Sequence, residues 1–397
     1  MQARKIEDTL YWVGAMDWDR RMFDELIPLP DGTSYNAYLL QGGGKAVLFD
    51  AVDPPMAATL FARLESLKVE RIDYLVAHHA EQDHSGSIPE VLERFPMAQV
   101  LCTPKCKTML IEHVHLKEER IREVKDGEVL SLGDLTLKFI HFPWVHWPET
   151  MLTWCPERKL LFTCDLFGSH KAASGVFVQD EALVLSEAKR YYAEIMMPFA
   201  SMISKSMAKL EGLDIRLILP SHGPVYQRPA LILDAYRDWL NAPPKNLAVV
   251  AFVSMHGSTR LMAEALVDAL GARGVRVEQY DLSKADIGKL ACDLVDAATV
   301  ALGSPTVLGG AHPAAASAAY LANLLRPKTK WLAVFGSYGW GGKLAEGLGA
   351  MLGAVKAELL PPVLVKGLPR RADYAAIEKL ADEIAARHAT LKEKPPA

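Results

Sequence analysis

The run Ile72-Asp-Tyr-Leu-Val-Ala-His-His-Ala-Glu-Gln-Asp-His-Ser-Gly86 places four potential metal ligands directly after an apolar segment. The apolar part predicts a buried strand, and the ligands then occupy the loop at its end. Side chains two positions apart can point to one side, so His79, Glu81 and Asp83 can converge while His84 turns toward a second centre. A solvated polar loop seldom alternates His and carboxylate in this way. The run therefore predicts a metal site.

Three more stretches place a potential ligand just after a predicted strand. His146-Trp-Pro follows one such strand, Asp165 follows the apolar run 159–164, and His222 follows the run 216–220. Each of these residues, taken alone, is more often a structural polar residue than a ligand. Four strand ends that carry His or carboxylate in this order favour one shared metal site.

The order His-x-Glu-x-Asp-His, then His, Asp and His, resembles the metallo-β-lactamase fold, an αββα sandwich with a two-metal site along one edge. The resemblance covers residues 1 to about 245. Glu81 stands where zinc hydrolases of this fold usually carry a second His. The extra carboxylate raises the share of hard oxygen donors, which favours iron over zinc. The implied metal ligands are His79, Glu81, Asp83, His84, His146, Asp165 and His222.

The chain divides at a proline-containing polar break over 241–246. We expect a β-rich α/β domain over 1–245 and a second domain over 246–397, with a low-complexity tail at 392–397. Strand-like and helix-like segments alternate five times after the break, which predicts a doubly wound, parallel, five-stranded sheet. The expected segments are strands at 247–253, 275–280, 299–303, 330–336 and 362–365, and helices at 260–272, 286–290, 314–325, 343–353 and 374–388.

Three loops of the second domain follow predicted strands, at the sheet edge where doubly wound folds bind ligands. Val253-Ser-Met-His-Gly-Ser-Thr259 opens the first helix and offers backbone N–H groups and hydroxyls to a phosphate. Ordinary N-capping by Ser or Thr is the alternative interpretation. The loops 303–310 and 336–342 can bind the edge of an isoalloxazine ring, with Tyr338 or Trp340 beside it.

These loops resemble flavodoxin, which binds FMN. The dinucleotide fingerprint G-x-G-x-x-G and the P-loop Lys are both missing from the sequence, which disfavours NAD, FAD and ATP. We therefore expect FMN. The expected cofactor-binding residues are Ser254, Met255, His256, Gly257, Ser258, Thr259, Ser304, Pro305, Thr306, Gly336, Ser337, Tyr338, Gly339 and Trp340.

Glu81, the context His146-Trp-Pro-Glu-Thr-Met151 and the strings Ser-Pro-Thr and Phe-Gly-Ser-Tyr-Gly-Trp are similar to the flavodiiron proteins, also called A-type flavoproteins. This resemblance covers nearly the whole chain. It implies that the residues His79, Glu81 and His146 hold one iron, that Asp83 and His222 hold the other, and that Asp165 bridges the two. It also implies that His84 either binds the second iron, which we expect, or turns away and leaves a water.

Several other residues have smaller roles in this interpretation. His256 and the pair Gly309-Gly310 depart from the family pattern. These departures bear on how side chains pack over the flavin and on the reduction potential of the flavin. Tyr191 and Tyr192 are candidate proton donors near the metals, although a core position is the more common role of such aromatics. The histidines that we expect, at most, to orient ligands are His78, His141 and His170.

Composition excludes several classes of protein. The 44 Lys and Arg against 48 Asp and Glu give a net charge of −4, so no charge excess points to nucleic acid or an anionic membrane. Five cysteines without a C-x-x-C pair fit reduced thiols and argue against a fused rubredoxin module. The uncharged stretch 297–325 is broken by Gly, Pro and Asn, which argues against a membrane span. Residues 1–10 carry charges and no apolar core, so we expect a cytoplasmic protein.

The resemblance predicts a flavodiiron oxidoreductase. FMN would accept electrons from an external donor, by analogy a rubredoxin or similar small carrier, and a non-haem di-iron site would reduce dioxygen to water, nitric oxide to nitrous oxide, or both. We also expect a head-to-tail homodimer, or a dimer of such dimers, in which the FMN of one subunit serves the metal site of the other. Two alternatives remain at this point, a metal hydrolase with an accessory flavodoxin domain and a pure electron carrier or redox sensor.

Overall fold

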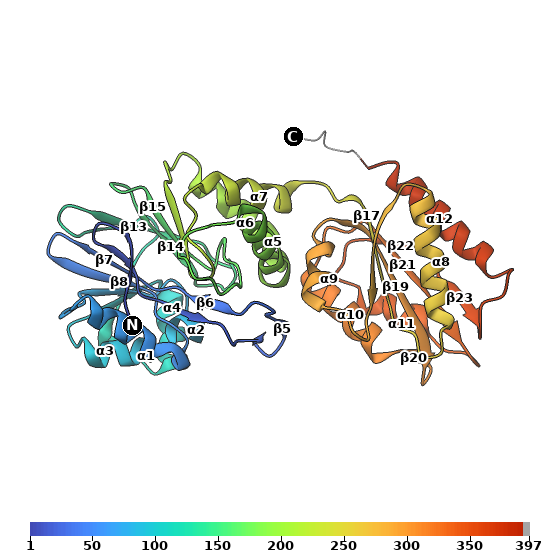
Figure 1. Ribbon diagram of the computed structural model, residues 1–397, viewed down its shortest axis with the longest axis horizontal. Coiled ribbons are helices and arrows are strands. Elements are labelled where there is room, and N and C mark those ends of the chain that lie inside the picture. The colour runs from blue at the N-terminus through green and yellow to red at the C-terminus, as the bar shows by residue number, and fades with distance from the viewer. Residues whose placement is uncertain (392–397) are drawn as a thin grey trace. The chain divides into compact units, whose positions relative to one another are not determined.

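The computed structural model describes residues 1–391, and the predicted tail over 392–397 lies outside the described residues. The chain forms two compact units, Met1–Leu240 and a second that begins at Asn241 (Figure 1). Within the described part of the chain, no helix is both long and apolar enough to cross a membrane.

The first unit contains two sheets. The larger is antiparallel from β1 to β8 and parallel from β8 to β11, so its later strands end at the same edge. In spatial order its strands are β1 (Arg4–Glu7), β2 (Leu10–Trp12), β7 (Tyr38–Gly42), β8 (Lys45–Phe49), β9 (Tyr74–Val76), β10 (Gln99–Cys102) and β11 (Ile121–Glu123).

The smaller sheet is antiparallel except for its last pair, which is parallel. Two antiparallel pairs of short strands, β3 (Ala15–Asp17) with β6 (Thr33–Tyr35) and β4 (Met22–Phe23) with β5 (Ile27–Pro28), stand apart from both sheets. The strands of the smaller sheet are β12 (Val129–Ser131), β13 (Thr136–His141), β14 (Met151–Cys155), β15 (Leu160–Cys164) and β16 (Leu217–Pro220).

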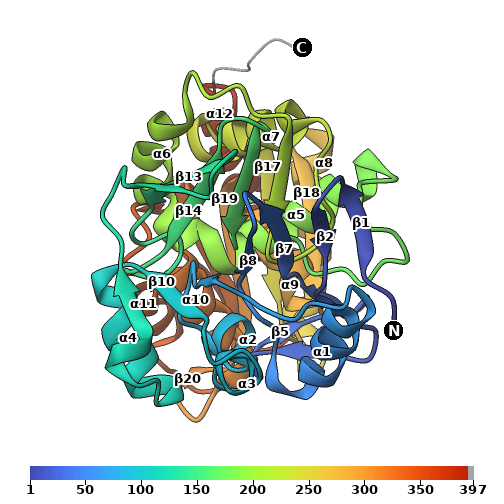
Figure 2. The same ribbon diagram turned by 90° about the vertical axis from the view of Figure 1, so that its left-hand side faces the viewer.

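Alternating side chains along the larger sheet explain why the first unit has four layers. Leu39 and Leu48 face a core shared with α1, α3 and α4, whereas Leu40 and Phe49, one residue further on, face a core shared with the smaller sheet. Both faces of the sheet are therefore covered, as Figures 1 and 2 show. The helices are α1 (Ala57–Ser66), α2 (Gln82–Ser85), α3 (Ile88–Arg94) and α4 (Pro104–Val114) on one side, and α5 (Glu181–Tyr191), α6 (Ala200–Met207) and α7 (Pro229–Asn241) on the other.

The second unit is a doubly wound α/β fold, as predicted. Its sheet runs β18, β17, β19, β21, and then β22 and β23, which both pair with β21 in parallel. Helices α8 and α12 cover one face and α9, α10 and α11 the other (Figure 1). The elements are β17 (Lys245–Phe252), α8 (Ser258–Ala272), β18 (Arg276–Asp281), α9 (Ile287–Leu294), β19 (Ala297–Val307), β20 (Gly310–Ala311), α10 (Pro313–Leu325), β21 (Trp331–Tyr338), α11 (Leu344–Met351), β22 (Glu358–Leu359), β23 (Val363–Lys366) and α12 (Tyr374–His388).

Strands β19 and β21 are longer than the sequence predicts. We expected loops to begin at 303 and 336, but pairing continues through Ser304 with Gly336 and Pro305 with Ser337. β20 then folds back on the end of β19, which prolongs that strand to Val307. Backbone pairing with a neighbour, rather than the Gly, Ser and Pro content of the segment, sets these ends.

Candidate metal centre and flavin site

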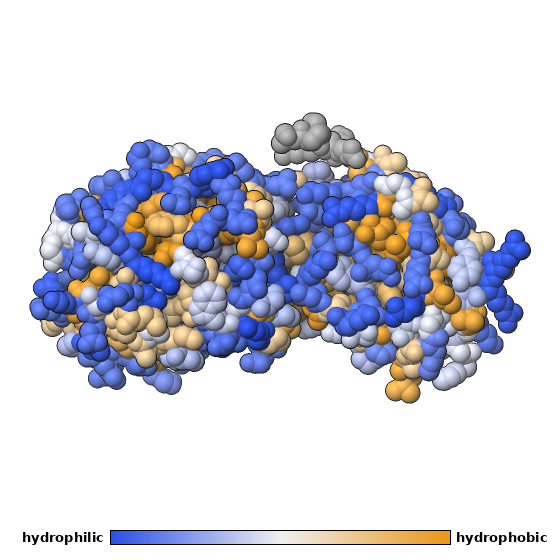
Figure 3. Space-filling model, viewed as in Figure 1, coloured by the Kyte–Doolittle hydropathy of each residue, from blue (hydrophilic) through white to orange (hydrophobic). Residues whose placement is uncertain are grey.

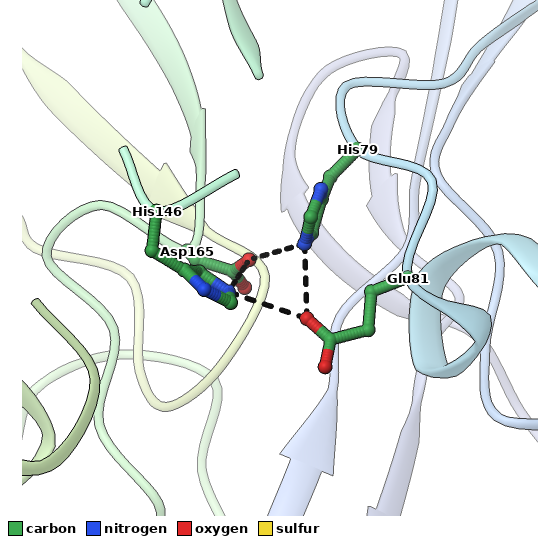
Figure 4. Close-up of side chains that lie close together, drawn as sticks. All are labelled: His79, Glu81, His146 and Asp165. Atoms are coloured by element: carbon green, nitrogen blue, oxygen red, sulfur yellow. Dashed lines mark hydrogen bonds and ion pairs between the residues drawn. The ribbon is translucent and has the colours of Figure 1, made fainter. Parts of the chain in front are cut away.

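The first ligand group lies where β9, β13 and β15 end. His79 and Glu81 follow β9, His146 follows β13 and Asp165 follows β15. The Oε2 atom of Glu81 lies 2.9 Å from Nε2 of His79 and 3.2 Å from Nε2 of His146. Oδ2 of Asp165 lies 3.6 and 3.4 Å from the same two nitrogens. The four side chains point toward one another, which leaves a common position for one cation (Figure 4).

The second ligand group contains Asp83 and His84 of α2 and His222 after β16. Nε2 of His222 lies 3.1 Å from Oδ2 of Asp83, and Nε2 of His84 lies 3.4 Å from Oδ1 of Asp83. Oδ1 of Asp165 faces this group, at 2.9 Å from His84 and 3.4 Å from His222. One carboxylate thus turns one oxygen to each group, which is the arrangement of a bridging ligand between two cations.

The donor set fits two cations. All seven predicted ligands lie in this cluster, and they supply four imidazoles and three carboxylates with little solvent access. Among the described residues, both oxygens of Asp83, both oxygens of Asp165 and both ring nitrogens of His84 are buried without a well-formed hydrogen bond. Unsatisfied buried polar atoms are costly, and bound cations would satisfy them. The mixture of imidazole and carboxylate suits iron.

The pKa shifts of the clustered side chains also indicate a site for cations. Burial alone would raise the pKa of Asp165, but the positive charge of His84 and the nearby ring nitrogens of His146 and His84 hold it well below its usual range. Burial alone would lower the pKa of His84, but the charges of Asp165 and Asp83 raise it to about 10. The imidazoles of His79, His84 and His146, whose pKa values are all raised, therefore bind protons strongly wherever cations do not replace them, and metal binding would release these protons.

Glu149 is a candidate site residue that the sequence analysis does not include. Its carboxylate is buried, accepts the backbone N–H of Ala80 at 3.0 Å and lies 2.6 Å from Nδ1 of His79. This contact orients the ring so that Nε2 faces the other ligands, and it makes His79 a stronger donor. The residue stood within the string 146–151, and an acid three residues after a candidate ligand His was the available signal.

A second orienting contact comes from the backbone. Nδ1 of His222 lies 2.7 Å from the carbonyl oxygen of Ser34 in β6 and must donate to it, which leaves Nε2 free to face Asp83. Cys164 also lies beside His84 and Asp165, and burial raises the pKa of its thiol well above the usual value.

The other predicted histidines have supporting positions. His78 bridges Asp50 and Thr153 with its two ring nitrogens, at 2.7 and 2.8 Å, and so anchors the loop after β9. His170 lies 2.9 Å from the hydroxyl of Thr33 and packs its ring 4.9 Å from that of His222.

His141 and the two candidate tyrosines differ in where they lie relative to the ligand cluster. His141 faces the carbonyl oxygen of Val124 and lies outside the cluster. Tyr191 is buried with its ring 5.9 Å from that of His222. The hydroxyl of Tyr192 instead faces the carbonyl of Trp239 at 3.5 Å, in an aromatic core.

The second unit has a cavity of about 290 Å³ at the carboxyl edge of its sheet. Gly257, in the left-handed region at φ +91°, precedes α8, whose N-terminus has no side-chain cap. The first N–H groups of α8 are therefore available to a phosphate, together with the hydroxyls of Ser258 and Thr259. The lining residues are Ser254, Met255, His256, Ser258, Thr259, Pro305, Thr306, Ser337, Tyr338, Gly339, Trp340 and Gly367.

Three predicted flavin residues do not line this cavity. Gly257 shapes the turn before α8. The hydroxyl of Ser304 accepts the N–H of His312 at 2.9 Å, which braces the loop after β19. Gly336 allows β21 to approach β19, because a Cβ there would lie 2.0 Å from the carbonyl oxygen of Ser304. We missed Gly367, which follows β23 and reaches the cavity only because that strand pairs with β21.

Comparison with known proteins adds three kinds of similarity. The model of the ODP family beta lactamases matches residues 33–223, and the flavodoxin model matches residues 250–380. A nitric oxide reductase from Moorella thermoacetica is 39% identical over 97% of this chain and 99% of its own length. The solved structure of the rubredoxin oxygen:oxidoreductase from Desulfovibrio gigas has a TM-score of 0.95 and 31% identity, with 98% of this chain and 99% of that chain covered. The flavodiiron protein from Giardia intestinalis has a TM-score of 0.93 and 28% identity, over 98% and 97% of the two chains.

Proposed function

Since this chain belongs to the flavodiiron proteins, we propose that its two sites work as one oxidoreductase that reduces small gases. The resemblance seen in the sequence is thereby confirmed, and the hydrolase and pure-carrier alternatives lose their support. Bound FMN supplies electron storage, and two bound irons supply the redox centre at which dioxygen becomes water, nitric oxide becomes nitrous oxide, or both reactions occur.

The observation that carries this function is the position of Asp165 between the two ligand groups. Its two oxygens face His79 and His146 on one side and His84 and His222 on the other. Two cations held on either side of this carboxylate would supply one centre at which dioxygen, or two nitric oxide molecules, could be reduced. Metal analysis after iron-replete anaerobic expression, followed by gas-consumption kinetics with each gas, tests the proposal. A protein with two zincs that stays inactive with both gases after iron reconstitution would contradict it.

We assign the ligands as follows. His79, Glu81 and His146 hold one iron, Asp83, His84 and His222 hold the other, and Asp165 bridges them. His84 is included because its Nε2 lies within hydrogen-bonding distance of the bridging carboxylate and near Asp83. Replacement of His84 by Ala should weaken the second iron only. Full retention of both irons would favour the alternative in which a water takes this place.

The flavin residues of the proposal are the three loops predicted from the sequence, together with Gly367. The uncapped N-terminus of α8 supports a single terminal phosphate, as in FMN. Chromatography of the flavin released by heat tests this, and recovery of FAD would count against it.

The electron donor that we propose is a rubredoxin or similar small carrier, because the Desulfovibrio gigas protein is described as a rubredoxin oxygen:oxidoreductase. We also propose a cytoplasmic location. Reduction of the bound FMN by purified rubredoxin, followed in the visible spectrum, tests the donor.

We propose that the working unit is a head-to-tail homodimer, alone or as part of a dimer of dimers. Two apolar side chains that line the flavin cavity support a protein partner there, since Met255 is 53% and Trp340 90% exposed. Figure 3 shows apolar atoms at the β20 end of this unit. Electron transfer also falls steeply with distance, and a second copy can bring a metal centre to the flavin.

A mixed dimer tests this arrangement. Asp165→Ala should remove the metal centre from one subunit, and Ser258→Ala with Thr259→Ala should remove FMN from the other. Each variant homodimer should be nearly inactive, whereas the mixed dimer, isolated with two affinity tags, should regain substantial gas reduction. Activity no higher than that of the parents, with verified cofactor content, would show that electrons move within one chain.

A further inference from the structure

Asp50 is a buried carboxylate whose hydrogen bonds go to residues beside the metal ligands. It directly follows β8, is 3% exposed and has a left-handed backbone at φ +53°, which Asp and Asn tolerate better than most residues. Its Oδ1 accepts the backbone N–H of His78 at 2.8 Å, and its Oδ2 lies 2.7 Å from Nδ1 of the same residue. A carboxylate only accepts hydrogen bonds, so Nδ1 donates. Both oxygens therefore hold the residue that directly precedes the ligand His79.

The same carboxylate reaches the second ligand group. Oδ2 accepts the hydroxyl of Ser221 at 3.4 Å, and Ser221 directly precedes the ligand His222. The next residue adds a backbone link, because the N–H of Ala51 donates to the carbonyl oxygen of the ligand His84 at 2.9 Å. Asp50 and Ala51 therefore connect the end of β8 to both segments that supply the second group.

The bridging ligand Asp165 is tied to the same network through the backbone. The N–H of Ser221 donates to the carbonyl oxygen of Cys164 at 2.8 Å. Cys164 directly precedes Asp165, is buried and is also left-handed, at φ +51°. The pairing of β15 with β16 is irregular at this point, which lets the chain turn before Asp165. The residues that directly precede three ligands are thus joined by hydrogen bonds. Asp50 bonds two of them, and the third is bonded through Ser221.

We propose that Asp50 is a positioning residue that sets the spacing between the two ligand groups, so that both irons bind tightly only while its carboxylate is present. The inference rests on the ligand assignment of the proposed function. Metal–ligand distances are fixed to within about 0.2 Å, so a shift of one strand end against another would pull a ligand away from its iron. Asp50 bonds the neighbours of His79, a ligand of one iron, and of His222, a ligand of the other. Glu149, in contrast, orients the ring of one ligand, His79.

Asp50→Asn tests the proposal, because the amide keeps the volume and tolerates the left-handed backbone but cannot accept both bonds from His78. The full chain with FMN bound, stripped of iron, is titrated anaerobically with ferrous iron in competition with a chelator. Both irons should bind about 10–100-fold more weakly than in the wild type, and they should weaken together. Glu149→Gln should weaken mainly one iron, so its competition curve should separate into two steps.

The matched control is Asp73→Asn. Asp73 is a carboxylate beside the same sheet, and it accepts the backbone N–H of Ala46 at 2.9 Å, away from the ligand loops. This variant should keep the wild-type affinity for both irons.

A second readout separates positioning from a merely structural role. Iron that binds only the folded chain raises the unfolding midpoint of the wild type. If Asp50 positions the ligands, Asp50→Asn should reduce this iron-dependent rise, beyond any fall in the midpoint of the iron-free protein. Ser221→Ala removes only the hydroxyl that joins Asp50 to the second group. It should weaken the second iron by about two- to tenfold and leave the first iron as it is.

Wild-type affinity for either iron in Asp50→Asn would overturn the proposal. Equal falls of the unfolding midpoint with and without iron would assign Asp50 a structural role and overturn it as well. If Asp50→Asn did not fold, an unchanged second iron in Ser221→Ala would decide against the link. If the wild-type protein bound two zincs and consumed neither gas, the proposed function would fail. The same competition and unfolding measurements with zinc would then still decide the role of Asp50.

Discussion

The metal centre and the flavin cavity are lined by different kinds of chemical groups. The metal centre collects seven charged or ionisable side chains from strand ends of two sheets and from α2, and most of them are buried. The flavin cavity lies at one edge of one sheet, and His256 is the only ionisable side chain other than Tyr338 among the residues that line it. The first site depends on distant parts of the chain meeting, and the second depends mainly on backbone groups and hydroxyls close to β17, β19 and β21.

The difference should appear in how each site responds to loss of its ligand. Without cations, the buried side chains of like charge repel one another, and buried polar atoms are left without hydrogen bonds. Metal binding and folding of the first unit are therefore coupled. The core beneath the flavin cavity is apolar, with Phe252, Ala301 and Phe335 packed below the loops. This unit should therefore fold with or without FMN.

The largest expected effect is that of Asp165→Ala, which removes the carboxylate shared by both groups. We expect near-complete loss of both irons, loss of gas reduction, and a fall of several degrees in the unfolding midpoint of the first unit, at roughly 2–4 °C per kcal/mol for a domain of this size. FMN content should be normal. Iron analysis and calorimetry check this, and retention of either iron would contradict a bridging role.

Gly336→Ala is the corresponding change in the second unit. The added Cβ would lie 2.0 Å from the carbonyl oxygen of Ser304 and 2.7 Å from Cδ2 of Leu344, so we expect a destabilisation of about 1–3 kcal/mol and weakened FMN binding. Iron content should not change. Gly347→Ala in α11, where a Cβ would meet nothing within 4 Å, is the control and should keep FMN. Equal loss of iron and FMN in Gly336→Ala would show that the two sites are not independent.

Glu149→Gln tests how far the orienting residue supports the metal centre. The amide keeps the volume but removes the charge that holds His79, so we expect iron to bind about 10–100-fold more weakly. Competition with a chelator measures the change. Glu157→Gln, which alters a surface carboxylate bound to Thr136, should leave iron affinity as it is. An affinity loss of the same size in both variants would remove the special role of Glu149.

The smallest expected effect is a pH dependence of the second unit. His388 donates from Nδ1 to Asn246 and accepts the hydroxyl of Thr299, and burial lowers its pKa from the ordinary 6.5 to about 4. Between these values the unfolded chain binds more protons, so the free energy of unfolding falls as pH drops from 6.5 to 4.

We expect this contribution to be about 1 kcal/mol after allowance for solvent screening. Chemical denaturation at pH 7 and pH 5 measures it, and His388→Gln should flatten the difference. If the free energy of unfolding of the variant changed as much between pH 7 and pH 5 as that of the wild type, the pH dependence would belong to other groups.

Much of this molecule was predictable because its signals are local. The alternation of apolar segments and polar breaks after residue 246 predicted the doubly wound sheet, and the resemblance carried by Glu81 and the Gly-rich loops predicted the family and both cofactors. Strand ends were less predictable. The composition of residues 304–307 predicts a loop, but pairing with β21 and β20 keeps these residues in a strand.

The sequence by itself determined which residues are candidate metal ligands, since His, Asp and Glu after apolar strands are visible as a pattern in one dimension. Only the tertiary structure decided which of their atoms face one another, for example that the two oxygens of Asp165 divide between the two groups. It also decided that the carboxylate of Glu149 lies 2.6 Å from Nδ1 of His79 and so orients that ring. These contacts join residues far apart in the chain, and burial sets their strength, so no local pattern could predict them.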